Sequence, residues 1–182
     1  MCIKRQVVQP VRSLAPGAVR DRDVARPDTR QRASAELVRV SGALIELDST
    51  NAAIARDWIA RIGVAFDIVE ADAGTTDAYA GLVPADLVLL SGIMGNISAE
   101  DIERLIHVSR QFCAPGATVL WTRGAQELDL GQNIRRWFSE AGYAEIACQE
   151  GIEGTGMRVG VEQFTGAPEP LRPGEPVFTF YR

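Results

Sequence analysis

Three strand-like runs, each ending in small or polar residues, set the strongest limit on how this chain can fold. They span residues 43–51, 66–74 and 85–98. Each run begins apolar, which is typical of a parallel strand that is buried on both faces. Open α/β sheets bind their ligands at the carboxyl ends of the strands. The polar clusters at Glu46, Asp72 and Ser91-Gly92 therefore predict one nucleotide-type pocket.

Helical periodicity fills the chain between and after these strands. Ser49 or Thr50 can cap the first helix, and Gly63 is suited to end it. The last two strands are joined by a glycine-rich stretch without helical periodicity, so they should be antiparallel. The expected helices lie near residues 50–62, 99–112 and 130–141, and the later strands near 117–121, 145–148 and 158–164.

The composition is that of a single soluble domain. At 182 residues and 46% apolar content the chain can bury a real core. No apolar run approaches the ~20 residues of a membrane-spanning helix, so we expect no membrane partner. Three widely spaced cysteines and one histidine predict reduced thiols in a cytoplasmic protein and no metal site.

Charge divides the chain unevenly. Residues 1–40 carry a net charge of +5, and the rest carries −10. An acidic main domain argues against a nucleic-acid partner. We expect an irregular basic arm at 1–40, an α/β domain at 41–166 and a proline-rich tail at 167–182.

The order of these motifs resembles class I S-adenosylmethionine-dependent methyltransferases, and a group of small bacterial members in particular. The resemblance runs from IELD at residues 45–48, through VEADAG at 69–74 and PADLVLLSGIMGNIS at 84–98, to APGATVLWTRG at 114–124. It implies a Rossmann-like α/β sheet, mostly parallel, that ends in an antiparallel C-terminal hairpin. It also implies S-adenosylmethionine as the cofactor and a small molecule as the methyl acceptor.

The resemblance assigns the cofactor residues at three strand ends. Glu46 would bind the ribose hydroxyls, since a carboxylate can accept two hydrogen bonds; Asp48 is a weaker candidate that can cap the helix instead. Asp72 and the Ala73 backbone would bind adenine, although Asp72 could also simply form a turn.

Two further positions complete the implied pocket. Ser91 and Gly92 would lie beside the methionine part of the cofactor, because small residues permit close backbone approach. Asn96 and Arg123 are candidates for substrate binding; alternatively, Asn96 caps a turn and Arg123 is a solvated charge. No catalytic residue stands out, and methyl transfer can depend largely on positioning.

The resemblance ends before Ser41. The family's first strand and its glycine-rich turn, of the form Cys-Ala-Gly-x-Gly-Arg-Asp, should lie about two dozen residues upstream of Glu46. The corresponding stretch contains only Gly17, preceded by Pro16. We hypothesise that residues before about Ser41 are encoded out of frame, which would leave the first strand absent or replaced.

Three functions follow as alternatives. The first is methyl transfer to an unidentified small molecule, and the second is a non-catalytic remnant that binds the cofactor weakly or not at all. The third, a nicotinamide-dependent oxidoreductase, lacks the glycine fingerprint and does not suit an antiparallel ending. Unpaired strand edges in a sheet without its first strand would favour self-association into a homo-oligomer.

Overall fold

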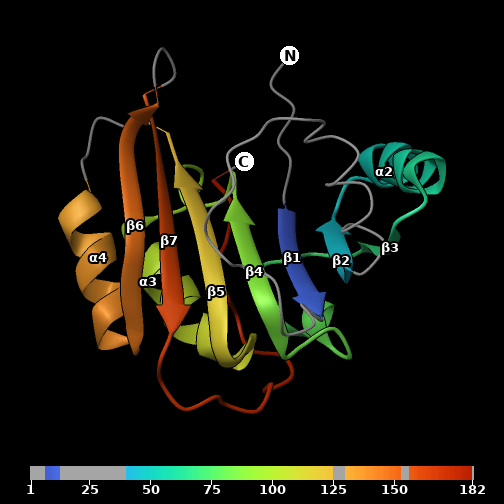
Figure 1. Ribbon diagram of the computed structural model, residues 1–182. Coiled ribbons are helices and arrows are strands. Elements are labelled where there is room, and N and C mark those ends of the chain that lie inside the picture. The colour runs from blue at the N-terminus through green and yellow to red at the C-terminus, as the bar shows by residue number, and fades with distance from the viewer. Residues whose placement is uncertain (1–6, 13–39, 125–129, 153–155, 182) are drawn as a thin grey trace, which may run out of the picture.

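A computed structural model describes residues 7–12, 40–124, 130–152 and 156–181 of the chain. Within them a seven-stranded sheet has the order β3-β2-β1-β4-β5-β7-β6. Figure 1 shows the sheet face-on, with α3 and α4 behind β4–β6 and α2 at the opposite end. The strands are β1 (Val7–Arg12), β2 (Ser41–Glu46), β3 (Ala65–Glu70), β4 (Ala85–Ser91), β5 (Cys113–Arg123), β6 (Tyr143–Ile152) and β7 (Met157–Phe164); the helices are α2 (Ser49–Ile62), α3 (Ala99–Val108) and α4 (Gly131–Glu140), with short 3₁₀ turns η1 (Thr76–Tyr79) and η2 (Ser109–Gln111).

Five strands run in one direction and two run against them. β2 pairs with β3 in parallel, and β4 pairs with β5 in parallel. β7 is antiparallel to both β5 and β6. β1 is antiparallel to both of its neighbours, β2 and β4. The carboxyl ends of β2, β3, β4 and β5 therefore share one edge of the sheet, seen at the top in Figure 1.

β1 is the main departure from the sequence expectation. We expected an irregular arm before Ser41, but Val7–Arg12 occupies the central slot of the sheet. Buried backbone groups on the inner edges of β2 and β4 need partners, and a β-branched segment can supply them. Pro10 lies within this strand, and a proline in a central strand argues against strand formation when the sequence is read alone.

The pairing of β1 is uneven. Five register pairs join it to β4, from Val7–Ser91 to Val11–Leu87. Only two join it to β2, at Val11–Gly42 and Arg12–Ser41. The remainder of β2, including Glu46, thus lies beyond its register with β1. We expected Leu37–Val40 to be a poor substitute strand; of these residues only Val40 lies in the described part, and it is not in a strand.

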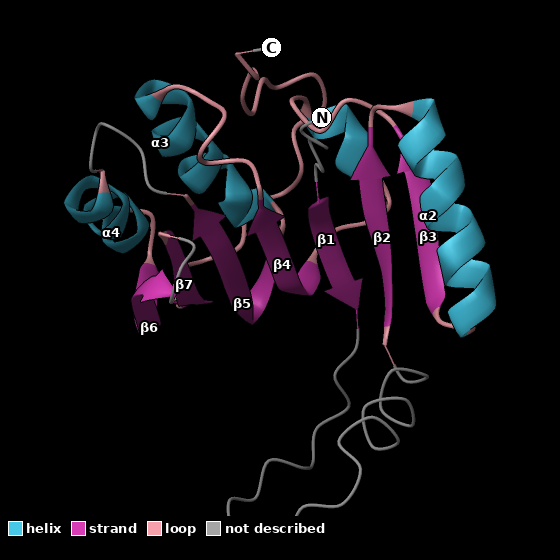
Figure 2. Ribbon diagram, turned by 90° about the horizontal axis from the view of Figure 1, so that it is seen from above, coloured by secondary structure: helices cyan, strands magenta, loops and turns pink. Residues whose placement is uncertain are grey.

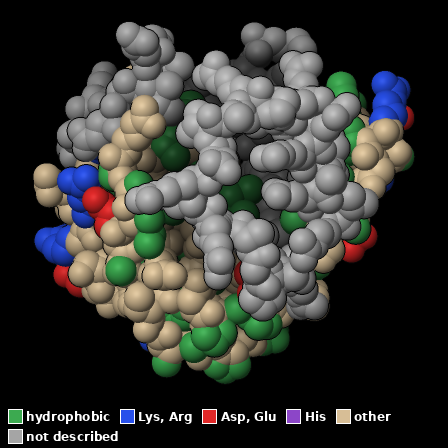
Figure 3. Space-filling model, in the orientation of Figure 1, with side chains coloured by type: hydrophobic (Ala, Val, Ile, Leu, Met, Phe, Trp, Pro, Cys, Tyr) green, Lys and Arg blue, Asp and Glu red, His purple; other side chains and the backbone are tan. Residues whose placement is uncertain are grey.

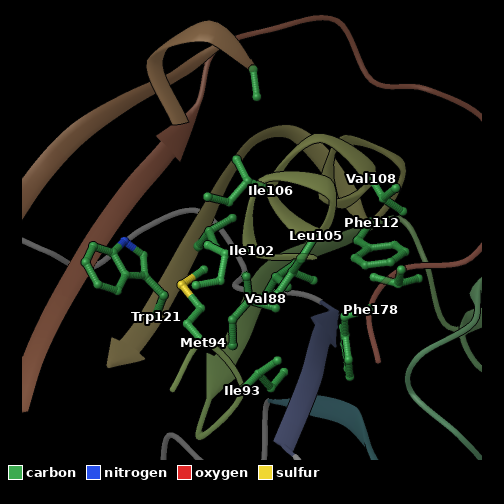
Figure 4. Packing of buried hydrophobic residues seen from close by; sticks show 14 of the residues in the cluster. Val88, Ile93, Met94, Ile102, Leu105, Ile106, Val108, Phe112, Trp121 and Phe178 are labelled. Atoms are coloured by element: carbon green, nitrogen blue, oxygen red, sulfur yellow. The ribbon is translucent and has the colours of Figure 1, made fainter. Parts of the chain in front are cut away.

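The core lies between the sheet and the helices α3 and α4. Ile102, Leu105 and Ile106 of α3 are fully buried, as their helical spacing predicted. Figure 4 shows them facing Val88, Met94 and Trp121 from the sheet side. Ser98 accepts a hydrogen bond from the Asp101 amide (3.0 Å) and so caps α3. Met94 is 0% exposed, so it belongs to the core and not to a ligand wall.

α2 is bounded differently from our expectation at its start. Asp48, and not Ser49 or Thr50, is the N-cap, and its carboxylate accepts from the Asn51 amide at 2.9 Å. Gly63 ends the helix as predicted, with a left-handed φ of 68° that glycine adopts without strain. α4 begins after Leu130, close to the start of the helix expected near residues 130–141.

The chain after β7 returns along the sheet to the edge at which β2, β3, β4 and β5 end. Its described residues form no strand, and a bridge joins Thr75 to Pro176. Phe178 is 3% exposed and packs into the core. Figure 2 views the molecule from above and shows the C-terminal end on the same side of the sheet as α3.

Candidate functional site

The site is built from the turns that follow β2, β3, β4 and β5. Because these strands run in the same direction, their terminal residues meet at one edge. The described residues include Glu46 after β2, Asp72-Ala73 after β3, Ser91-Gly92 after β4 and Thr122 near the end of β5. The structure therefore brings the predicted strand ends to a common edge.

Glu46 is a buried carboxylate at this edge. Its side chain is 5% exposed, and Oε1 accepts the Asp48 amide at 2.9 Å. Its backbone carbonyl accepts from the Ala71 amide at 3.2 Å, which links the ends of β2 and β3. One carboxylate oxygen is thus fixed by its own turn, and this bond sets the orientation of the side chain. Asp48 has the helix-capping role.

Asp72 forms the turn that follows β3. Its Oδ1 accepts the Gly74 amide at 2.8 Å, as the turn-forming alternative predicted. The side chain also lines an open hollow of about 270 Å³, together with Val69, Ala71 and Thr75. Ala73 is fully buried, and its carbonyl accepts from the Tyr79 hydroxyl at 2.8 Å. Burial, followed by the charge of Asp72, raises the pKa of Tyr79, so this hydroxyl stays protonated and keeps the bond.

The ends of β4 and β5 are joined through Thr122. Its Oγ1 accepts the Gly92 amide at 3.0 Å and lies 3.3 Å from Ser91 Oγ. Gly92 has φ = 73°, a conformation that favours glycine. The Asn96 side chain donates to the Gly92 carbonyl at 2.8 Å, so Asn96 braces this turn. The turn-capping alternative for Asn96 is the one that the structure shows.

Arg123 does not join this group. Successive residues of a strand point to opposite faces, and Thr122 points toward Ser91. Arg123 therefore points to the other face, where it is 8% exposed. Its partner across the ladder is Arg158 of β7. It is a buried cation next to another strand and not a solvated charge.

Residues 176–181, which we call the C-terminal strap, also reach this edge. The Val177 amide donates to the Gly74 carbonyl at 2.8 Å, and the Tyr181 amide donates to the Asn96 carbonyl at 3.1 Å. A Cβ on Gly74 would lie 2.5 Å from the Phe178 carbonyl, so only glycine permits this approach. The sequence predicted only a proline-rich tail at 167–182, and nothing in it named Gly74 or Asn96 as partners of this segment.

Because β1 runs antiparallel to β2 and β4, the turn that follows β1 does not lie at the edge where β2 and β4 end. Val7 pairs with Ser91 at the edge where β4 ends, whereas Arg12 pairs with Ser41 at the opposite edge. β1 therefore ends far from the strand ends just described. A turn that leaves the central strand cannot offer its amides to a ligand there, in keeping with the lack of a glycine-rich motif in this part of the sequence.

A separate cluster could coordinate a cation. Glu103 and His107 of α3 and Glu140 of α4 place one ligand atom each within 4.8 Å of one another. Glu103 and Glu140 are exposed and His107 is half-buried. Arg136 Nε lies 3.7 Å from Glu140 Oε1, so the guanidinium partly neutralises the Glu140 carboxylate. The cluster joins α3 to α4 and contains none of the strand-end residues described above.

Where the face in Figure 3 shows described residues, charged side chains of both signs are present. Basic and acidic side chains alternate over the α4–β6 end, at the left of the view. Arg135 Nε and Glu145 Oε2 form one such pair at 2.8 Å. No helix in the described part of the chain is long and apolar enough to cross a membrane.

Comparisons with known proteins bear on the fold. No family model matches the chain, and neither does any curated protein. An O-methyltransferase family protein from Burkholderia thailandensis has a TM-score of 0.57 at 15% identity, over 72% of this chain and 45% of that protein. The fibrillarin pre-rRNA processing protein of Methanococcus jannaschii has a TM-score of 0.56 at 15% identity, over 68% and 56%.

A third structure was solved with a cofactor product. SMU.776, described as a methyltransferase and complexed with S-adenosylhomocysteine, has a TM-score of 0.53 at 8% identity, over 66% of this chain and 38% of that protein. The chain thus spans roughly half or less of these proteins. At these identities the comparisons show the fold alone, a mixed α/β sheet of the kind that methyltransferases use.

Proposed function

We propose that this chain binds S-adenosylmethionine at the carboxyl ends of β2, β3 and β4 and transfers its methyl group to a small molecule. The observation that carries the proposal is the buried Glu46 carboxylate, held in place at the end of β2 within a methyltransferase-type fold. A buried carboxylate is costly unless it is hydrogen-bonded. A ribose diol would satisfy its remaining acceptor capacity.

The nucleoside half of the cofactor fits the residues present. Glu46 Oε1 is fixed by the Asp48 amide, which leaves Oε2 to accept from a ribose hydroxyl. The hollow beside Asp72 lies after the neighbouring strand, where an adenine ring would follow the ribose. Gly92, without a side chain and braced by Thr122 and Asn96, permits close approach at the end of β4.

The methionine half fits less well. β1 ends at the opposite edge, so this chain offers no backbone amides from a turn after the central strand. The cofactor supplies an electrophilic methyl group on a sulfonium. The chain's contribution is to orient the cofactor beside Ser91 and Gly92, and alignment alone can provide much of the acceleration of such a transfer. No described residue stands out as a general base.

The antiparallel β1 specifically favours one other function, that of a non-catalytic protein. Without the backbone cradle, a fold that retains Glu46 and Asp72 could bind the nucleoside weakly and transfer nothing. Both proposals place the ligand at the same residues and differ in affinity and turnover.

Calorimetric titration with S-adenosylhomocysteine separates these two proposals. We expect micromolar binding by the intact chain. Replacing Glu46 with glutamine should weaken binding about 10–100-fold, because a hydrogen bond to a charged group contributes ~1.5–3 kcal/mol. Glu70→Gln is the matched control, since Glu70 is the parallel register partner of Glu46 at the end of β3.

The results of the titration and of a methyl-transfer assay distinguish the proposals. Binding that survives Glu46→Gln unchanged contradicts the assignment of Glu46. A chain that shows a cooperative melting transition but no binding supports the non-catalytic protein. Binding without transfer of a radiolabelled methyl group to any of a panel of small-molecule acceptors supports it as well.

A further inference from the structure

Helix α2 carries two apolar faces. Ala52 is buried, and Ala55 and Ile59 are half-buried; at spacing i, i+3, i+7 these residues share one side of the helix. Ile54, Trp58 and Ile62 follow at spacing i, i+4, i+8 and form a second stripe, which we call the outer stripe. The two faces lie about 100° apart around the helix, because Trp58 and Ile59 are consecutive and each residue turns the helix by about 100°.

The outer stripe is open to solvent. Ile54, Trp58 and Ile62 are 49%, 59% and 57% exposed. α3, by contrast, buries its apolar stripe under the sheet. Single exposed apolar residues are ordinary, but a contiguous stripe containing tryptophan marks an interaction surface. Figures 1 and 2 show α2 alone at the β3 end of the sheet, apart from α3 and α4.

The sequence of the β1–β2 connection does not match this stripe. Residues 13–39 contain no aromatic residue. Their only leucines and valines stand at positions 14, 19, 24, 37 and 38, which repeat at no helical spacing, and prolines stand at 16 and 27. An apolar ridge complementary to Ile54, Trp58 and Ile62 is therefore not encoded there.

The outer stripe does match itself. Two copies of α2 running antiparallel about a two-fold axis at Trp58 would set Ile54 of one beside Ile62 of the other. Asp57 and Arg61, an ion pair of 2.6 Å within the helix, flank the stripe on one side. The same axis brings Asp57 of each copy beside Arg61 of the other. Both the shape and the charge of this face are thus self-complementary, as a two-fold interface requires.

The size of the stripe suits the centre of such an interface. A tryptophan and two isoleucines, each about half exposed, offer roughly 250 Å² per copy. A standard interface takes about 800 Å² per partner, with a central apolar cluster and a polar rim. Leu47 is 55% exposed just before the helix, and β3 is the outermost strand at this end of the sheet, so both offer further surface to such an interface.

We propose that a second copy of this chain packs against the outer stripe, with the two α2 helices antiparallel about an axis near Trp58. The proposal does not depend on the proposed function, because the stripe is separate from the strand ends. Its natural probe is tryptophan fluorescence. Trp121 is 0% and Trp137 is 5% exposed, so quenching by acrylamide reports mainly on Trp58.

Sedimentation velocity over micromolar to near-millimolar concentrations tests the proposal, with quenching followed in parallel. We expect a dimer to form as concentration rises and acrylamide quenching to fall with it. Ile62→Glu should raise the dimer dissociation constant about a hundredfold, because it places a charge in the apolar centre. Ile146→Glu is the control, since Ile146 is 60% exposed on β6 at the far end of the sheet.

A charge exchange tests the antiparallel arrangement itself. Asp57→Arg should weaken the dimer, and the double change Asp57→Arg with Arg61→Asp should restore it. A chain that stays monomeric throughout the concentration range overturns the proposal, whether Trp58 is quenched or shielded. So does a dimer that Ile62→Glu leaves intact. A dimer that the double change fails to restore overturns the antiparallel geometry.

Discussion

Glu162 is a buried acid whose carboxylate accepts a hydrogen bond from the indole of Trp121. It lies on β7 and is 1% exposed, and Trp121 Nε1 donates to it at 3.2 Å. The indole ring covers Gly160, where a Cβ would lie 2.2 Å from the ring. Burial raises the pKa of the Glu162 carboxyl from 4.5 to about 7, against the smaller lowering effect of the indole bond.

This raised pKa predicts a stability that falls as pH rises. The unfolded carboxyl loses its proton near 4.5 and the folded one near 7, so the charged form is penalised only in the folded state. The penalty is absent below pH 4.5 and complete above pH 7. Glu162→Gln keeps an acceptor for the indole and removes the charge.

We therefore expect Glu162→Gln to raise Tm by a few degrees at pH 8, for about 1–2 kcal/mol, and to leave it unchanged at pH 4.5. Scanning calorimetry at the two pH values measures this. Glu140→Gln removes an exposed acid of α4 that pairs with Arg136; it is the control and should show no such gain. An equal change at both pH values would show that Glu162 is not the titrating group.

Single residues also show the limit of sequence interpretation. Asp48, Asp72 and Asn96 each had a ligand-binding and a local role open, and each uses its side chain to cap or brace a turn. Short polar side chains bond nearby backbone in either case, so residue type cannot separate the two roles. Glu46 also accepts a nearby amide, that of Asp48, and its ligand-binding role stays a prediction. Thr122 could not be singled out from the sequence, because its partners Ser91 and Gly92 lie 30 or more residues away.

At the scale of elements, the sequence predicted what periodicity encodes. The strands around Ile45, Val88 and Val119 and the helices α2, α3 and α4 form near their expected positions. β1 could not be foreseen, because its position depends on the empty slot between β2 and β4 and not on its own pattern. Tertiary context overrides local preference in such strands.

The C-terminal strap gives the prediction at this scale. Thr179 donates its amide to Asp101 Oδ2 at 3.0 Å, and Asp101 also pairs with Arg104. Asp101→Ala should increase trimming of the C-terminus by carboxypeptidase about 10–100-fold, because the opening equilibrium gains the ~1.5–3 kcal/mol of a charged hydrogen bond.

Mass spectrometry of timed digests measures the trimming. Glu100→Ala is the matched control, since Glu100 is also an acid in the first turn of α3 but is exposed. Equal trimming of the two variants would mean that the Asp101 bond does not hold the strap.

At the scale of the molecule, the described residues form a mixed sheet in which β1 runs against both of its neighbours, β2 and β4. A turn after β1 therefore lies at the edge opposite to the carboxyl ends of β2 and β4. A reading frame shifted before about Ser41 would account for both the antiparallel β1 and the change of composition at this point. We expect the coding DNA of residues 1–40, read in another frame, to specify an apolar strand followed by a glycine-rich turn.

Two measurements test this at the scale of the molecule. A chain with the shifted segment restored should melt at a higher temperature and bind S-adenosylhomocysteine more tightly than the present chain. If no frame of the DNA yields the turn, the hypothesis is eliminated and the present β1 is the native central strand.

The central position of β1 has a further consequence during synthesis on the ribosome. Val7 is made early, but its partner Ser91 is made 84 positions later. At about 5–20 residues per second, β1 waits on the order of ten seconds for β4. Throughout that time Val7 and Val8 of the nascent chain have no partner strand, because β2 pairs with β1 at Val11 and Arg12. This interval is when a chaperone that recognises short apolar segments has its best opportunity to bind.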